Sequence, residues 1–187
     1  MNRISNLAKI ALFGVFAVSA NQAALAQDDG PFFGKHAKGK WIVGIKAAKI
    51  ENNIEEIKDA DGFGIVLGYQ FDSPVGGNGT STVELEYISG DDTNIQTIAS
   101  YDADILNLFF TYRSPGTLYF KAKAGLSYSD IELNSPAFRS TNEDVAFALG
   151  LGIGYHIGDY GVVELEYSAD SGENDLGVLG LNALLEF

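Results

Sequence analysis

From residue 40 onward, large apolar residues alternate with polar or very small ones. In an extended chain successive side chains point to opposite faces, so this period predicts strands with one apolar and one polar face. Strands in soluble proteins more often have about five or six residues, whereas most of the segments here reach the ~10 that cross a bilayer. The eight segments lie near residues 40–49, 62–71, 80–89, 102–113, 117–129, 144–156, 160–169 and 176–187.

A five-residue repeat raises the question of which face is inside. Val83–Tyr87 and Val163–Tyr167 both read VELEY, so each copy puts two glutamates on one face and Val, Leu and Tyr on the other. If the apolar faces pointed inward, as in a lipocalin-like barrel, they would overfill the space that eight strands enclose. We therefore predict an all-β, eight-stranded antiparallel up-and-down transmembrane barrel with its apolar faces toward lipid.

Other side chains agree with the apolar-out arrangement. The polar faces carry glycines, which suit a small interior, although Val66, Ile105, Phe109 and Leu184 depart from the pattern. Tyrosines near the strand ends suit the two membrane interfaces. They are Tyr69, Tyr87, Tyr112, Tyr128, Tyr155 and Tyr167.

The connections between the segments alternate in length. Short or turn-forming ones lie at 72–79, 114–116 and 158–159, and longer, acidic ones lie at 50–61, 90–101, 130–143 and 170–175. Outer-membrane barrels place short turns in the periplasm and long loops outside. We therefore expect the acidic connections to be extracellular, as a solvated surface, with binding of Ca²⁺ or Mg²⁺ shared with lipopolysaccharide phosphates as the alternative.

Charged residues on the polar faces predict an ionic network in the lumen. A carboxylate in so small a space needs a basic partner and hydrogen bonds. The members are Lys46, Glu84, Glu86, Arg113, Lys121, Lys123, Glu164, Glu166 and Glu186. Equal depth along the strands places Glu84, Lys121 and Glu164 in one layer. We interpret the network as a structural plug; a gated or narrow ion path is the alternative.

The first residues have the pattern of an export signal. Arg3 and Lys9 precede and flank an apolar run that is too short to span a bilayer, and Ala24-Leu25-Ala26 fits a cleavage site. A buried core helix is the alternative. We expect residues 1–26 to be a signal peptide, 27–39 a periplasmic N-terminal extension, and 40–187 the barrel.

The charge and the cysteine count exclude some classes of function. The net charge of −13 argues against nucleic acid as a partner, because neutralising phosphates needs Lys and Arg. The chain has no cysteine, so neither a disulfide nor a cysteine-linked lipid is expected.

The opening strand Gly39–Gly44 (GKWIVG), the alternating segments and the final strand Leu181–Phe187 (LNALLEF) carry a family resemblance. The chain resembles the small eight-stranded outer-membrane barrels of the opacity-protein and OmpA-like types. This resemblance implies integral location in the bacterial outer membrane, in contact with outer-membrane lipid and lipopolysaccharide. It also implies that Phe187 belongs to the signal that the barrel-assembly machinery reads. The peptidoglycan-binding domain of some relatives is not expected here.

The histidines argue against an enzyme. Some small barrels that modify lipid resemble one another in placing His, Ser and an acid near the outer leaflet. Here His36 and His156 both fall on the short-turn side, so no catalytic role is expected. Asp59-Ala60-Asp61-Gly62 lacks the later ligands of a calcium loop, and the glycines of 150–154 lack the helix of a phosphate loop. Neither a cofactor nor a metal is expected.

The sequence thus predicts a barrel with a structural or surface-interaction role, through acidic loops that contact a host or surface ligand. Two alternatives remain: a small low-conductance porin and a lipid-modifying enzyme.

Overall fold

The computed structural model describes residues 39–52, 59–71, 79–92, 100–135, 138–172 and 176–187. The predicted signal peptide lies outside these residues, as does the predicted extension except for Gly39. Within the described ranges, no helix is long and apolar enough to cross a membrane. The strands are β1 (Lys40–Asn52), β2 (Ala60–Phe71), β3 (Thr80–Asp92), β4 (Ser100–Arg113), β5 (Leu118–Ser135), β6 (Phe138–Ile157), β7 (Gly161–Asp170) and β8 (Leu176–Glu186).

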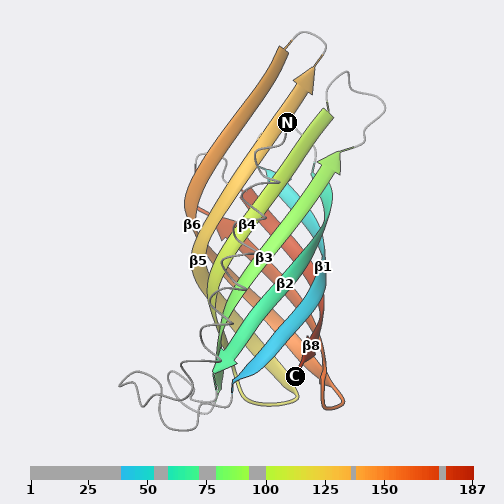
Figure 1. The fold of residues 1–187 in the computed structure, drawn as a ribbon, viewed down its shortest axis with the longest axis vertical. Helices are drawn as coiled ribbons and strands as arrows, with labels where there is room; N and C mark the ends of the chain where they lie inside the picture. Colours follow the sequence, from blue (N-terminus) through green and yellow to red (C-terminus); the bar gives the residue numbers. More distant parts are fainter. Residues whose placement is uncertain (1–38, 53–58, 72–78, 93–99, 136–137, 173–175) are drawn as a thin grey trace, which may run out of the picture. The chain divides into compact units, whose positions relative to one another are not determined.

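The eight strands form a closed antiparallel barrel in sequence order (Figure 1). Each strand pairs with the next along the chain, and β1 pairs with β8 from Ile42↔Glu186 to Asn52↔Leu176. The closing seam is extended by two backbone hydrogen bonds, from Trp41 N to Phe187 O (2.8 Å) and from Phe187 N to Trp41 O (3.0 Å). The predicted fold class is confirmed.

One predicted connection is wrong. Residues 130–143 were expected to be a loop, but β5 continues to Ser135 and β6 begins at Phe138, paired from Asp130↔Glu143 to Ser135↔Phe138. The backbone hydrogen bonds of a hairpin do not require apolar side chains. The pattern of alternation marked only the part of the hairpin that has an apolar face, so it ended too early.

The apolar faces point outward. Large side chains along β5 and β6 are exposed, such as Phe120 and Leu151, at 73% and 71% of their surface. All six tyrosines near strand ends share this outward face. Side chains at alternate positions are buried inside the barrel, and these include the four exceptions to the polar pattern. Those four are Val66, Ile105, Phe109 and Leu184.

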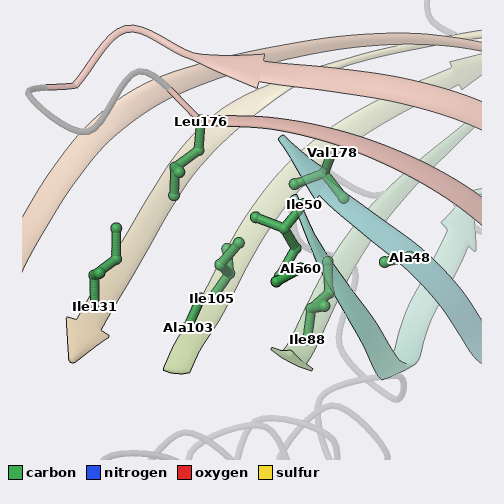
Figure 2. Close-up of a cluster of buried hydrophobic side chains, with 9 residues drawn as sticks. All are labelled: Ala48, Ile50, Ala60, Ile88, Ala103, Ile105, Ile131, Leu176 and Val178. Atoms are coloured by element: carbon green, nitrogen blue, oxygen red, sulfur yellow. The ribbon is translucent and has the colours of Figure 1, made fainter. Parts of the chain in front are cut away.

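The interior is layered along the strands. Toward the long connections lies an apolar cluster, which we call the upper layer (Figure 2). Toward the short turns lies a second cluster, the lower layer, made of Ile42, Val66, Tyr119, Val162 and Leu184. The charged side chains lie between the two apolar layers. On β1, for example, Lys46 lies between Ile42 of the lower layer and Ile50 of the upper layer. The upper layer consists of Ala48, Ile50, Ala60, Ile88, Ala103, Ile105, Ile131, Leu176 and Val178.

Glycines on the inner face of β6 make room for side chains from β5. A Cβ atom at Gly154 would clash with the ring of Tyr119, and one at Gly150 would clash with the side chain of Lys123. The inner wall of β6 is thus bare backbone where its neighbour contributes long side chains. This complementarity lets a small lumen hold several large polar groups.

The outward face of β6 should distinguish lipid contact from water contact. We expect Leu151→Lys to lower the free energy of unfolding by about 2–4 kcal/mol, because a charge would enter the hydrocarbon belt. Thr141→Lys, on the same face of the same strand but beyond the end of β7, should change it by less than about 0.5 kcal/mol. Urea unfolding in lipid vesicles measures both. Equal effects of the two substitutions would contradict the placement of the belt.

Candidate functional site

Four glutamates stand on opposite inner walls of the barrel. Glu84 and Glu86 come from β3, and Glu164 and Glu166 come from β7, four strands away in the ring of eight. Their side chains are at most 2% exposed. Because residues two apart in a strand share a face, each VELEY copy delivers two carboxylates to the lumen at successive depths.

The pair nearer the short turns is bridged by Arg113 and Lys121. The guanidinium of Arg113 donates from Nε to Glu164 Oε1 (2.8 Å) and from Nη2 to Glu84 Oε1 (2.5 Å). Lys121 Nζ lies 2.7 Å from Glu164 Oε2 and 3.0 Å from Glu84 Oε2. Glu84, Lys121 and Glu164 therefore lie together in one layer.

The pair nearer the long connections is bridged by two lysines. Lys46 Nζ lies 2.6 Å from Glu86 Oε2 and 2.6 Å from Glu166 Oε1. Lys123 Nζ lies 2.9 Å from Glu86 Oε1 and 2.5 Å from Glu166 Oε1. Lys121 Nζ joins the two layers through Glu166 Oε2, at 2.7 Å.

The eight side chains balance in charge. Four carboxylates face four cations, and every carboxylate contacts at least two of those cations. Moving charges out of water costs several kcal/mol per ion, and only close pairing offsets that cost. The arrangement is stable as a unit, since the loss of any one member leaves a buried partner with too few contacts.

Four uncharged residues support the network, and the sequence analysis did not identify them as members. Tyr119 donates from its hydroxyl to Glu164 Oε1 (2.7 Å), and Asn182 donates from Nδ2 to Glu164 Oε2 (3.3 Å). Thr82 Oγ1 accepts from Arg113 Nη1 at 2.8 Å. Lys123 Nζ lies 4.3 Å from the centroid of the Phe109 ring, a cation–π contact.

A signal for these residues was present in the sequence. Tyr119 and Asn182 occupied the polar faces, and Phe109 was an apolar residue out of pattern. Selecting only charged side chains left them out.

Glu186 is not part of this network, contrary to the sequence-based prediction. It is buried, but its contacts are Lys40 Nζ and His156 Nε2, both at 3.9 Å and both at the short-turn end. Glu186 is the last residue of β8, and Leu184 and Asn182 separate it from the network on the inward face. β8 runs toward the short-turn end, so counting residues from that end would have separated Glu186 from the network glutamates.

Phe187 lies at the barrel seam, paired through its backbone with Trp41, and its side chain is exposed. Its part in assembly stays a prediction.

The histidines do not form a catalytic group. His156 packs its ring against Tyr119, with centroids 5.0 Å apart, near the short-turn end, while His36 lies outside the described residues. Among the residues that the structure describes, no three His, Asp or Glu side chains are placed to hold a metal ion. The lumen charges are saturated by one another, so the arrangement suits holding walls together.

Comparison with known proteins agrees with this architecture. Residues 10–182 match the family model described as outer membrane protein beta-barrel domain. No curated protein matches the sequence.

Several solved structures are similar to the chain in fold. The N-terminal β-barrel domain of Pseudomonas aeruginosa OprF is 18% identical, with 80% of this chain and 100% of that chain covered and a TM-score of 0.60. Ail, the attachment invasion locus protein of Yersinia pestis, is 12% identical, with 81% and 99% covered and a TM-score of 0.57. Neisserial surface protein A is 12% identical, with 80% and 97% covered and a TM-score of 0.54.

We expect the double substitution Lys121→Met and Lys123→Met to destabilise the barrel strongly. It leaves Glu164 and Glu166 buried with fewer cations, and breaking one buried pair costs about 3–5 kcal/mol. Lys49→Met is the matched control: Lys49 is half exposed, pairs with Asp59 (2.6 Å), and should change the stability little, because solvent screens an exposed ion pair. Urea unfolding in detergent gives both values. Unchanged stability of the double variant would rule out a stabilising network.

Proposed function

This chain belongs to the outer membrane protein beta-barrel domain family and is an integral barrel of the bacterial outer membrane, and we propose that it is a sealed structural barrel whose exposed rim makes surface contacts. The observation that carries the proposal is the occupied lumen. The described inward side chains form two apolar clusters with a charged network between them, and the members of all three are buried.

The layered interior argues against a water-filled path. An ion entering from the long connections would meet the upper layer, whose members are at most 9% exposed. It would next meet eight mutually paired charges, and then the lower layer. Eight strands leave an interior just wide enough for side chains. A low-conductance porin is therefore the second candidate.

The proposal of surface contact rests on the part of the sheet that extends beyond the band of outward apolar side chains, which we call the membrane belt. β5 and β6 have 18 and 20 residues, whereas β7 has 10. Outward-facing residues of this extension include the acidic Asp130, Glu132 and Glu143, whereas lower outward positions of the same strands are apolar. Such a surface suits water and polar partners. We place it outside the cell, because the short turns of such barrels lie in the periplasm.

The exposed rim is the extension of β5 and β6 beyond the end of β7. Its carboxylates limit the kind of partner that the protein can bind. Ail has been solved in complex with sucrose octasulfate, a heparin analogue, at 13% identity to this chain and a TM-score of 0.57. A polysulfated ligand needs cations, and the described rim of this chain offers carboxylates. We therefore propose that the surface ligand of this protein is positively charged. Outer-membrane lipid and lipopolysaccharide contact the belt and its upper edge, and the barrel-assembly machinery reads Phe187 during insertion.

We propose no enzymatic role. A hydrolase needs a base close to a nucleophile near the substrate. His156 packs against Tyr119 at the opposite end from the long connections. A change in the mass of lipid A on expression of this chain would revive the lipid-modifying alternative.

Planar-bilayer recording tests the sealed barrel against the porin. We expect the wild-type barrel to give no stable conductance steps, since two apolar layers and an ionic plug block the lumen. The double variant Lys121→Met and Lys123→Met should also be silent, because both apolar layers remain. Reproducible wild-type steps, with ion selectivity altered in that variant, would contradict the proposal and favour the porin.

A further inference from the structure

The two VELEY segments divide the barrel into an N-terminal half, β1–β4, and a C-terminal half, β5–β8. They lie on β3 and β7, four strands apart in the ring of eight, so matching one segment to the other also matches the two halves. The strand registers then fix which residues correspond. Glu84 pairs with Gly68 on β2. Glu164 pairs with Gly154 on β6, so the two glycines occupy equivalent positions.

The correspondence continues along the strands without adjustment. Four residues before these glycines both strands again have glycine, as Gly64 on β2 and Gly150 on β6. Gly64 pairs with Lys46 on β1. Gly150 pairs with Lys123 on β5, so two lysines of the network are equivalent as well. Identical residues recur at further equivalent positions: Tyr69 and Tyr155, Leu106 and Leu179, and Leu108 and Leu181. Because the registers leave no free choice in the matching, these identities indicate that one half repeats the other.

The network layer nearer the long connections has the same two-fold arrangement. Lys46 is equivalent to Lys123, and Glu86 is equivalent to Glu166. Each lysine contacts both glutamates, at N–O distances between 2.5 and 2.9 Å. Across the whole network each half supplies two cations and two glutamates, so each half is neutral within it. Every network cation contacts a glutamate of its own half and a glutamate of the other half.

The layer nearer the short turns departs from this arrangement. Lys121 is equivalent to Gly44, and Arg113 is equivalent to Glu186. The two seams between the halves also differ, because Arg113 pairs with Lys121, whereas Glu186 pairs with Ile42 instead of Gly44. A shift of two residues keeps each side chain on its own face of the sheet. The halves thus differ where the barrel closes and agree in the other layer.

We infer that the barrel is a tandem repeat of one four-stranded half, and that the inner wall of each half is a docking surface for another half of the same kind. The partner is defined by its chemistry, a four-stranded sheet whose inner face presents two glutamates and two cations at this spacing. Because each half is neutral within the network, two copies of one half also bring four cations to four glutamates. The inference is independent of the proposed surface role.

The first test is a tandem barrel made of two C-terminal halves. Residues 117–186 are followed by the natural connection 114–116 and then by 117–187, so Glu186 of the first copy takes the place of Arg113. There it lies opposite Lys121 of the second copy, which is a pairing of opposite charges. We expect this chain to refold in detergent, with heat-modifiable gel mobility and one cooperative urea transition. The matched control carries Lys123→Met in both copies, lacks the two lysines that bridge one layer, and should not refold.

The second test uses the natural chain. Lys46→Met and Lys123→Met replace equivalent lysines that each contact two glutamates. We expect them to lower the urea midpoint by comparable amounts. Lys121→Met should lower it further, because Lys121 contacts three glutamates and has no equivalent in the N-terminal half.

Each result bears on one part of the inference. Failure of the tandem chain to refold overturns the docking of like halves. Refolding of its Lys123→Met control also overturns it, because the halves would then associate without the network. In the natural chain, a lowered midpoint for only one of Lys46→Met and Lys123→Met overturns the equivalence of the two halves.

Discussion

Closure of the sheet is the constraint on which the other features of this protein depend. Inside a bilayer no water is available to bond the backbone, so an open edge is not tolerated there. β1 and β8 meet this requirement along their whole length, down to the Trp41 and Phe187 backbone pair. Closure with only eight strands then fixes the size of the interior. The outside must be apolar, and the inside can hold only side chains.

The ionic network is one solution to filling that interior. An apolar filling would have been simpler, and replacing buried ion pairs by apolar groups is often neutral or stabilising. The charges instead link opposite walls of the barrel, because each of the four cations contacts a glutamate of β3 and a glutamate of β7. The apolar layers above and below keep water away, and this strengthens each contact.

The fold and much of the network could be predicted from the sequence, because both depend on a period of two. Alternation identified the strands and put Glu84, Lys121 and Glu164 on one face at one depth. The alternation could not be followed where neither face of a strand is apolar. The sequence analysis therefore ended β5 too early and began β6 too late. It also failed where depth mattered more than face, as for Glu186. The period of two placed Tyr119 on a polar face and marked Phe109 as an exception, but the contacts that join them to the network depend on distances between strands.

The distribution of the network charges along the chain has a consequence for assembly. All four network cations belong to β1, β4 and β5, and β3 adds two network glutamates, so the network side chains of the first five strands have an excess of two positive charges. The two glutamates of β7 cancel that excess. An unfinished sheet is therefore electrically unbalanced on its inner face, and neutrality arrives only when the second VELEY segment docks. Formation of a neutral core therefore requires the C-terminal part of the sheet as well as the N-terminal part.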